Sequence, residues 1–391
     1  MLSGRVLNNS IRMRLELGPI VPGCSDLMTE FSRDGCFIRL FYPTSLSHIK
    51  KHSARWIPWL ADDMYFEGFA RVLQIWKFLI KFVVWLLAGN CHIPAVWNAD
   101  VKQEGGKLPV VVFSHGLGAT RFFYSSVCVE LASHGFVVAA VEHRDKSASA
   151  SYYYKSEDGY TDVTPTWMKF KVIGLGPGHY AARKKQVTKR VQECRKVIDI
   201  LEKLNSGIYI ENVLGRDFKL GQFKDRLNLT SLTMMGHSFG GATALLTLGC
   251  DCRLKFGVIL DPWMFSLKEE LDLPNIIKQP LLFVNTETFH VATNFNAVKR
   301  YTDSTPDECG KRTVFTIKGT THESQADTPH LVGYWLNWKM KKLPPVIASR
   351  INNHLILDFL QKNIGLNHEL DTSFLTAHAE SVIEGIIEWR Q

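Results

Sequence analysis

The chain has 391 residues, of which 46% are hydrophobic and 21% charged, and its 46 Lys and Arg residues against 38 Asp and Glu residues give a net charge of +8. This composition is that of an ordered globular protein and excludes a disordered chain or a bundle of membrane-spanning helices. The positive excess is spread along the chain without a recognisable nucleic-acid-binding module. Nucleic acid is therefore excluded as a partner, and an anionic membrane surface is the better interpretation of the basic clusters.

The first 17 residues carry four charged side chains and no continuous apolar core, so they do not predict a secretory signal, and Leu2 excludes N-myristoylation. The eight cysteines are scattered, with no CxxC pair and no histidine spacing suited to zinc. We therefore expect mostly buried thiols and no metal. A cytoplasmic location is favoured, with a secreted protein as the alternative if the N-terminus is incomplete.

From about residue 108 onward, short apolar runs alternate with longer helical patterns, which indicates βαβ units. Before this point, residues 36–42 begin with the alternation of an N-terminal antiparallel strand, and residues 57–97 form an aromatic-rich insertion. Apolar residues recur every three or four positions from 187 to 204, which predicts a helix covering the sheet. The runs predicted to be parallel strands are residues 108–113, 136–141, 231–235, 256–260, 280–284 and 313–317.

The strongest local motif is residues 236–240, Gly-His-Ser-Phe-Gly, which follows an apolar strand and opens a run of small residues. It fits a nucleophile elbow, the tight strand-to-helix turn that presents Ser238 as a nucleophile. Glycines stand on both sides because the serine backbone is strained and neighbouring chains come close. Three fixed positions also match by chance, so the interpretation depends on the strand, the helix and the partners downstream.

Asp261 directly follows the predicted strand 256–260, at the edge where open α/β sheets build their sites. The order Ser, Asp, His along the chain is the one expected for this fold, and the acid would orient and charge-stabilise the base. The alternative for Asp261 is that it only starts a turn before Pro262.

His322 follows the predicted strand 313–317 through a short turn, at the loop position from which a base can reach the serine. A serine hydroxyl needs such a base because it is a weak nucleophile at neutral pH. A lone histidine is often structural, which is the alternative here and our interpretation of His290 and His330.

The oxyanion formed on attack needs two backbone donors, one from the residue after the serine and one from a loop after an earlier strand. Phe239 would supply the first. Residues 113–118, which follow the apolar run 108–112, would supply the second through Leu117. An ordinary glycine turn is the alternative for this loop.

Residues 72–87 are apolar apart from Gln74, Lys77 and Lys81, whose spacing places them on one face of an amphipathic helix. Lysines in its middle argue against a membrane span, so this helix either packs on the core or lies in a membrane interface. Residues 331–342 combine aromatic residues with a cationic end, and two such patches suggest a substrate at a lipid surface.

Six parts of the chain carry a family resemblance: residues 22–28, 37–43, 113–118, 142–145 and 236–243, and Asp261 with Trp263, Met264 and Phe265. Over residues 19 to 366, the chain resembles the platelet-activating factor acetylhydrolases, both the plasma lipoprotein-associated and the intracellular type II forms.

This resemblance implies calcium-independent hydrolysis of the sn-2 acetyl, short or oxidised acyl ester of a glycerophospholipid, without a cofactor. It implies a triad of Ser238, Asp261 and His322, and oxyanion donors at Leu117 and Phe239. It also implies a membrane or lipoprotein surface as partner. The positions that it assigns to that surface are Leu79, Ile80, Leu336 and Met340.

Three departures from the family pattern leave the acyl-chain range and the rate open, although none removes a catalytic atom. Pro262 stands where the family usually has Ala, the residues after His322 read Glu-Ser-Gln, and residues 167–179 are divergent and glycine-rich.

We therefore predict one α/β-hydrolase domain over residues 19–366, with a mostly parallel sheet flanked by helices and an insertion at 57–97. Residues 1–18 would be an N-terminal extension and residues 367–391 a C-terminal tail. The predicted activity is that of a serine esterase peripherally bound to a membrane. Two alternatives stay open: a general carboxylesterase or lipase on the same fold, and a catalytically silent lipid-binding homologue.

Overall fold

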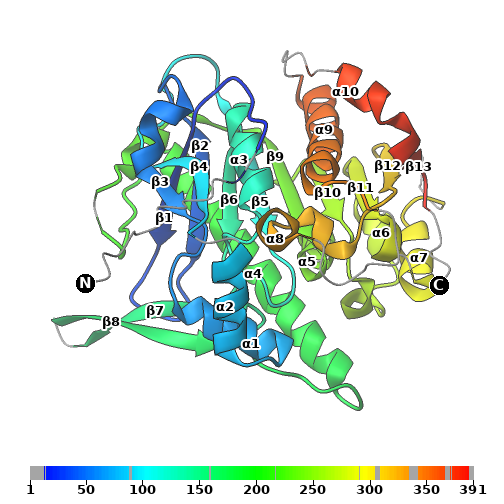
Figure 1. Ribbon diagram of the computed structural model, residues 1–391, viewed down its shortest axis with the longest axis horizontal. Helices are drawn as coiled ribbons and strands as arrows, with labels where there is room; N and C mark the ends of the chain where they lie inside the picture. The colour runs from blue at the N-terminus through cyan, green and yellow to red at the C-terminus, as the bar shows by residue number, and fades with distance from the viewer. Residues whose placement is uncertain are drawn as a thin grey trace, which may run out of the picture.

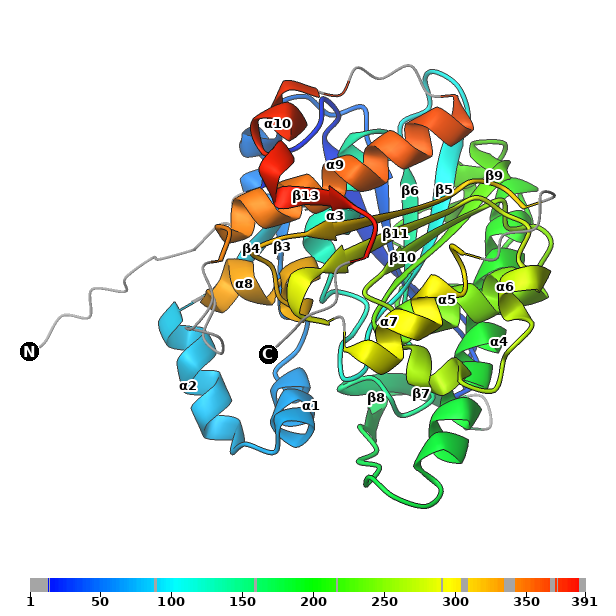
Figure 2. The same cartoon turned by 90° about the vertical axis from the view of Figure 1, so that its right-hand side faces the viewer.

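A computed structural model gives the fold (Figures 1 and 2). The structure describes residues 13, 15–87, 90–157, 160–215, 217–289, 291–303, 309–333, 342–365, 370 and 372–386. In these residues one large mixed sheet runs through the molecule, with helices on both of its faces, and a separate two-stranded hairpin lies beside it. This architecture confirms the predicted fold class.

The centre of the large sheet is parallel, in the order β12-β11-β10-β9-β5-β6. Every apolar run predicted to be a parallel strand is one of these strands, with ends that shift by four residues at most because polar residues extend some of the pairing. Their bounds are β5 Leu108–Ser114, β6 Val137–Val141, β9 Leu227–His237, β10 Phe256–Leu260, β11 Leu281–Thr286 and β12 Arg312–Ile317.

Shorter pairings flank this centre at both edges. The predicted antiparallel strand is confirmed as β2 (Phe37–Pro43), which lies between β6 and β1 (Pro22–Met28) and is antiparallel to both. Beyond β1 come β4 (His92–Trp97) and β3 (Trp56–Pro58). At the other edge β13 (Val382–Glu384), from the predicted C-terminal tail, pairs with β12. The division into domain, extension and tail stays a prediction.

Two hydrophobic layers sandwich the sheet, because successive strand residues point to opposite faces. In β5, Val111 and Phe113 belong to the layer that contains α3 (Ser125–Ser133) and α9 (Pro345–Ile364). Val110 and Val112 belong to the opposite layer, with α4 (His179–Asn205) and α5 (Phe239–Cys250). The helix predicted over residues 187–204 is confirmed as α4, which begins eight residues earlier and ends one residue later.

The predicted amphipathic helix over residues 72–87 is instead two helices, α1 (Met64–Leu73) and α2 (Lys77–Leu87). Gln74 ends α1 in a left-handed conformation with φ 55°, so it shares no helical face with the lysines of α2. Across the hairpin, Lys77 pairs with Glu67 of α1 and Lys81 pairs with Asp63, the residue before α1. Figure 2 shows α1 and α2 standing out from the body of the molecule beside α8 (Thr328–Val332).

Shorter elements connect this framework. The separate hairpin is β7 (Ala150–Glu157) and β8 (Tyr160–Lys169). Within the described ranges, no helix is both long enough and apolar enough to cross a bilayer. The remaining helices are η1 Ile49–Arg55, η2 Leu220–Phe223, η3 Met264–Leu267, α6 Leu273–Ile276, η4 Glu287–Phe289, α7 Ala292–Lys299, η5 His322–Gln325, α10 Thr372–Ala377 and η6 Ala379–Ser381.

Candidate active site

Ser238 lies on the turn between β9 and α5, with φ 57° and ψ −119°, a strained conformation for a residue with a side chain. The flanking glycines are required by space. A Cβ on Gly236 would lie 2.1 Å from the carbonyl oxygen of Gly240, and a Cβ on Gly240 would lie 2.0 Å from that of Ser114. The turn thus holds a half-buried serine at the end of the sheet, as the motif predicts.

Asp261 follows β10, the strand next to β9, and its side chain is fully buried. Thr286, at the end of the following strand β11, donates its backbone N–H to Asp261 Oδ1 at 2.7 Å and its hydroxyl to Oδ2. Asp261 also has a left-handed backbone, with φ 39°. These constraints aim the carboxylate across the carboxyl edge of the sheet.

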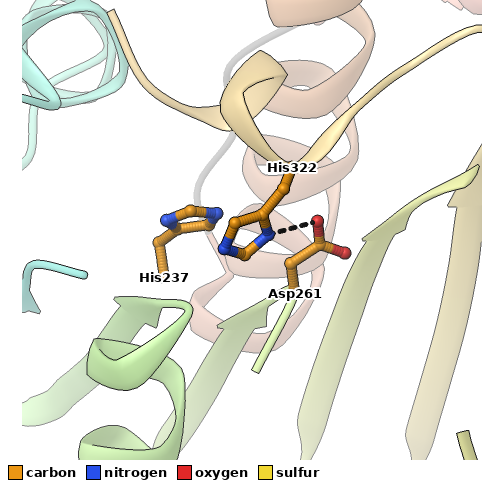
Figure 3. A group of neighbouring side chains, drawn as sticks. All are labelled: His237, Asp261 and His322. Atoms are coloured by element: carbon orange, nitrogen blue, oxygen red, sulfur yellow. Dashed lines mark hydrogen bonds and ion pairs between the residues drawn. The ribbon is translucent and has the colours of Figure 1, made fainter. Parts of the chain in front are cut away.

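The structure brings His322 onto this carboxylate (Figure 3), where Nδ1–H donates to Asp261 Oδ2 at 3.0 Å. That bond leaves Nε2 as the nitrogen with a free lone pair. The turn that carries His322 is fixed because Gly319 N–H donates to Glu287 Oε2 at 2.6 Å. Thr321 and Ser324 cap the short helix η5 reciprocally.

Two aromatic rings enclose the His322 imidazole. The Phe289 ring stacks on it with centroids 3.7 Å apart, and the His237 ring lies at 4.4 Å. Burial lowers the pKa of His322 to about 4, so the ring is neutral at pH 7 and can accept a proton. Burial also lowers the pKa of His237, whose Nδ1 accepts the Tyr124 hydroxyl at 2.8 Å.

Leu117 and Phe239, the predicted oxyanion donors, lie on two adjoining segments. Phe239 is the first residue of α5, where backbone N–H groups have no acceptor within the helix. Leu117 lies in the loop after β5, next to Gly116. A Cβ on Gly116 would lie 3.4 Å from Ser238 Cβ, which places the loop against the nucleophile.

His237, Asp261 and His322 also offer ligand atoms that lie within 4.8 Å of one another. However, Asp261 Oδ1 accepts a Thr286 donor, and Oδ2 accepts both Thr286 and His322. A metal at this place would have to displace those bonds, so the arrangement fits a hydrogen-bonded acid and base better than a set of metal ligands. The expectation that no metal is needed stays a prediction.

A second Ser, His and carboxylate set lies one strand away. Ser114, the last residue of β5, shares a hydrogen bond of 2.8 Å between its Oγ and His143 Nε2. His143 Nδ1 shares a hydrogen bond of 2.7 Å with Glu193 Oε2 of α4. Ser114 and His143 are fully buried. No sequence pattern indicates this set, because its members are far apart in the chain and lie in no nucleophile motif.

Sequence reasoning also missed Thr286, Phe289 and Tyr124, which fix the acid and the two histidine rings. Thr286 had a signal, because it ends the strand beside the one that Asp261 follows, and polar residues at such strand ends meet at one edge. Phe289 and Tyr124 had none, since aromatic residues are common and their stacking depends on loop geometry.

The residues assigned to a membrane surface differ in placement. Leu79 is 41% exposed, but Ile80 is only 9% exposed and packs in the layer of α3 and α9. Ile80 therefore cannot present its side chain to a membrane in this structure, because α2 turns that face toward the body. Leu336 and Met340 lie outside the described residues.

Of the departures from the family pattern, Pro262 is accommodated by the elbow itself. A Cβ on Gly241 would lie 3.0 Å from Pro262 Cα, so this glycine makes room for the residue after the acid.

Comparisons with known proteins show the family of the chain. Residues 6–380 match the family described as platelet-activating factor acetylhydrolase, isoform II. The chain is 36% identical over 379 residues to the platelet-activating factor acetylhydrolase of Gallus gallus, covering 94% of this chain and 86% of that one. It is 37% identical over 358 residues to that of Cavia porcellus, covering 90% and 78%.

A solved structure supports the fold alone. A ferulic acid esterase from Streptomyces cinnamoneus superposes with a TM-score of 0.64 at 17% identity, covering 95% of this chain and 98% of that one. Its likeness agrees with an α/β-hydrolase fold. With the family match over nearly the whole length, the chain is a hydrolase that belongs to the isoform II family of platelet-activating factor acetylhydrolases.

Proposed function

We propose that the chain is a calcium-independent serine esterase that cleaves the sn-2 acetyl, short or oxidised acyl ester of platelet-activating factor and related glycerophospholipids. The observation that carries the proposal is the hydrogen bond from His322 to the buried Asp261, beside a serine held on a strained elbow. The family relationship supports the substrate class.

In the proposed mechanism, Ser238 attacks the ester carbonyl while His322 Nε2 takes the hydroxyl proton. The lowered pKa of His322 keeps this nitrogen unprotonated at neutral pH. The backbone N–H groups of Leu117 and Phe239 stabilise the tetrahedral oxyanion. His322 then gives its proton to the leaving lysophospholipid oxygen, and a water molecule cleaves the acyl-enzyme by the same steps. Asp261 holds the ring tautomer throughout.

The test is hydrolysis of 2-acetyl phosphatidylcholine by the wild-type protein and by Ser238→Ala, with and without a calcium chelator. We expect turnover that the chelator leaves unchanged and the substitution abolishes. Faster turnover of a long-chain phosphatidylcholine would favour a general lipase instead. A protein that an organophosphate fails to label at Ser238 would be a silent lipid-binding homologue.

A second part of the proposal is that the protein docks peripherally on a membrane or lipoprotein surface through the α1–α2 hairpin. Large apolar side chains on this hairpin face solvent. Soluble proteins rarely expose so many neighbouring apolar side chains unless they form an interaction surface. Their proximity to paired lysines suits an interface between headgroups and acyl chains. The exposed residues are Leu73, Ile75, Trp76, Phe78, Leu79, Phe82, Trp85 and Leu86.

Co-sedimentation with phosphatidylcholine vesicles tests this surface. The double variant Phe82→Glu and Trp85→Glu should bind vesicles several-fold less, because both side chains are more than half exposed, at 54% and 67%. Tyr209→Glu is the matched control, since Tyr209 is 75% exposed and lies beyond the end of α4. Equal binding by all three proteins would exclude the hairpin as the docking surface.

We propose a cytoplasmic location, because the eight cysteines, all within the described residues, are free thiols and five of them are buried.

A further inference from the structure

The peptide unit between Gly116 and Leu117 differs from its neighbours, because the N–H groups before and after it both have hydrogen-bond acceptors. Gly116 N–H donates to the Tyr124 hydroxyl at 3.1 Å, and Gly118 N–H donates to the Ser147 carbonyl at 2.8 Å. In the part of the chain that the structure describes, the N–H of Leu117 has no acceptor. This is the group that the proposed function assigns to the oxyanion.

The direction of that N–H is set from the other end of the peptide. In a trans peptide the C=O and the N–H point in opposite directions, so fixing the oxygen fixes the hydrogen. The Gly116 carbonyl oxygen accepts His115 Nδ1–H at 2.8 Å, and Arg190 Nη2 lies 3.5 Å from it. Arg190 Nη1 donates to the preceding carbonyl, that of His115, at 2.6 Å.

Arg190 also holds the outer side of the loop. Its Nη2 and Nε donate to Ser147 Oγ at 2.7 and 3.0 Å, and the carbonyl of Ser147 is the acceptor for Gly118 N–H. Asp145 Oδ2, 3.2 Å from Nε, is its charged partner. One guanidinium thus braces the residues on both sides of Leu117.

The same guanidinium reaches the second half of the oxyanion site. Its central carbon lies 4.5 Å from the ring centroid of Phe239, whose backbone N–H is the other proposed donor. Arg190 is fully buried on α4, so it does not touch a substrate. A cation that polarises the carbonyl of a peptide also strengthens the N–H of that peptide as a donor.

We propose that Arg190 is the positioning residue of the oxyanion hole, holding the Leu117 peptide and the Phe239 ring in the geometry that stabilises the tetrahedral intermediate. The inference rests on the proposed function, because it assigns a role within that site. It predicts a defect in the transition state rather than in substrate binding.

The test compares Arg190→Gln with the wild-type enzyme on 2-acetyl phosphatidylcholine. Loss of one oxyanion donor lowers kcat by about 10²- to 10³-fold, so we expect a fall in kcat of about 10²-fold with KM changed less than about threefold. Arg190→Lys keeps the charge without the fork and should recover part of the rate.

Arg144→Gln is the matched control. Arg144 is also buried and also donates to backbone carbonyls, those of Gly35 at 2.6 Å and Tyr152 at 2.8 Å, but it contacts neither oxyanion segment. We expect both Gln variants to lower the melting temperature and only Arg190→Gln to lower kcat. Equal kcat losses in the two variants would overturn the proposal.

A transition-state readout separates positioning from general loosening. A trifluoromethyl ketone analogue of the ester forms a tetrahedral oxyanion on the serine, whereas a 2-ethyl ether analogue binds without reacting. Arg190→Gln should weaken the binding of the ketone by about 10²-fold and the binding of the ether by less than about threefold. Equal weakening of both would sink the idea.

If Arg190→Gln does not fold, Ser147→Ala carries the same test, because it removes the hydroxyl that Arg190 holds. It should lower kcat several-fold with KM unchanged, and a wild-type kcat would overturn the proposal. Activity that survives in Ser238→Ala would instead defeat the proposed function itself, so the two failures are distinguishable.

Discussion

Two Ser, His and carboxylate sets lie on neighbouring strands, one at Ser238 and one at Ser114, which is paired with Gly236 across β5 and β9. In each set one ring nitrogen of a histidine bonds a carboxylate, at 3.0 Å in the first and 2.7 Å in the second. Their exposure differs. Ser238 is half-buried on a strained turn, whereas Ser114 is completely buried at the end of an extended strand.

The difference teaches that hydrogen-bond geometry alone does not make a nucleophile. Asp261 is fixed by both donors of Thr286 and faces a histidine whose other nitrogen is left free. Burial raises the pKa of Glu193 to about 7 and lowers that of His143, so the second set carries less charge at pH 7 than an exposed Glu and His pair would. The second set is a brace between β5 and α4, and of the two serines only Ser238 is partly exposed to solvent.

The most direct test of this difference is to replace each serine in turn. Ser238→Ala should lower kcat by about 10⁴-fold or more, because no other hydroxyl replaces the nucleophile. Ser114→Ala should lower it less than about tenfold, since it removes one hydrogen bond of the brace. Rates on 2-acetyl phosphatidylcholine measure both, and a larger loss in Ser114→Ala would reverse the assignment.

Substitution of the two carboxylates, Asp261 and Glu193, should likewise lower kcat much more in the first set than in the second. Asp261→Asn keeps the size of the side chain but presents the wrong hydrogen to His322, so we expect kcat to fall roughly 10³- to 10⁴-fold with the fold retained. Glu193→Gln should lower the melting temperature with kcat reduced less than about tenfold. Single-turnover rates and thermal unfolding measure the pair, and similar kcat values in both variants would count against a distinct role for Asp261.

The Ser238 set could be predicted from the sequence because each of its residues lies in a local pattern. An elbow needs glycines at two fixed positions around Ser238. The carboxyl ends of parallel strands lie at one edge of the sheet, so polar residues that follow these strands, such as Asp261 and His322, are expected to lie close together. The strands themselves were predictable because runs covered on both faces must be continuously apolar.

The rest depends on contacts that have no local pattern. The Ser114 brace and Arg190 each join residues tens of positions apart, and their side-chain types are common. The break between α1 and α2 at Gln74 was also missed, because the apolar periodicity continues across it. In the structure, the left-handed Gln74 and a short turn end α1 there. Ile80 was assigned to the surface because an apolar stripe does not reveal which part of it packs on the body.

Gly240 is the point where the two sets share space, so a substitution there tests how tightly they are packed. A Cβ on Gly240 would lie 2.0 Å from the Ser114 carbonyl oxygen, a backbone atom that cannot yield. Gly240→Ala should lower the free energy of unfolding by about 3 kcal/mol or more. Gly174→Ala, where a Cβ meets nothing within 4 Å, should stay within about 0.5 kcal/mol in the same urea titration.

The smallest effect concerns pH. Protonated His322 cannot accept the serine proton, so activity is lost as pH falls through its pKa, and burial lowers that pKa to about 4 from an ordinary value near 6.5. The acid limb of kcat/KM should therefore lie below pH 6.5. Glu193, with its pKa raised to about 7, lies in the brace, and Glu193→Gln should leave the limb where it is. An inflection near pH 7 that disappears in Glu193→Gln would show instead that the buried set titrates with catalysis.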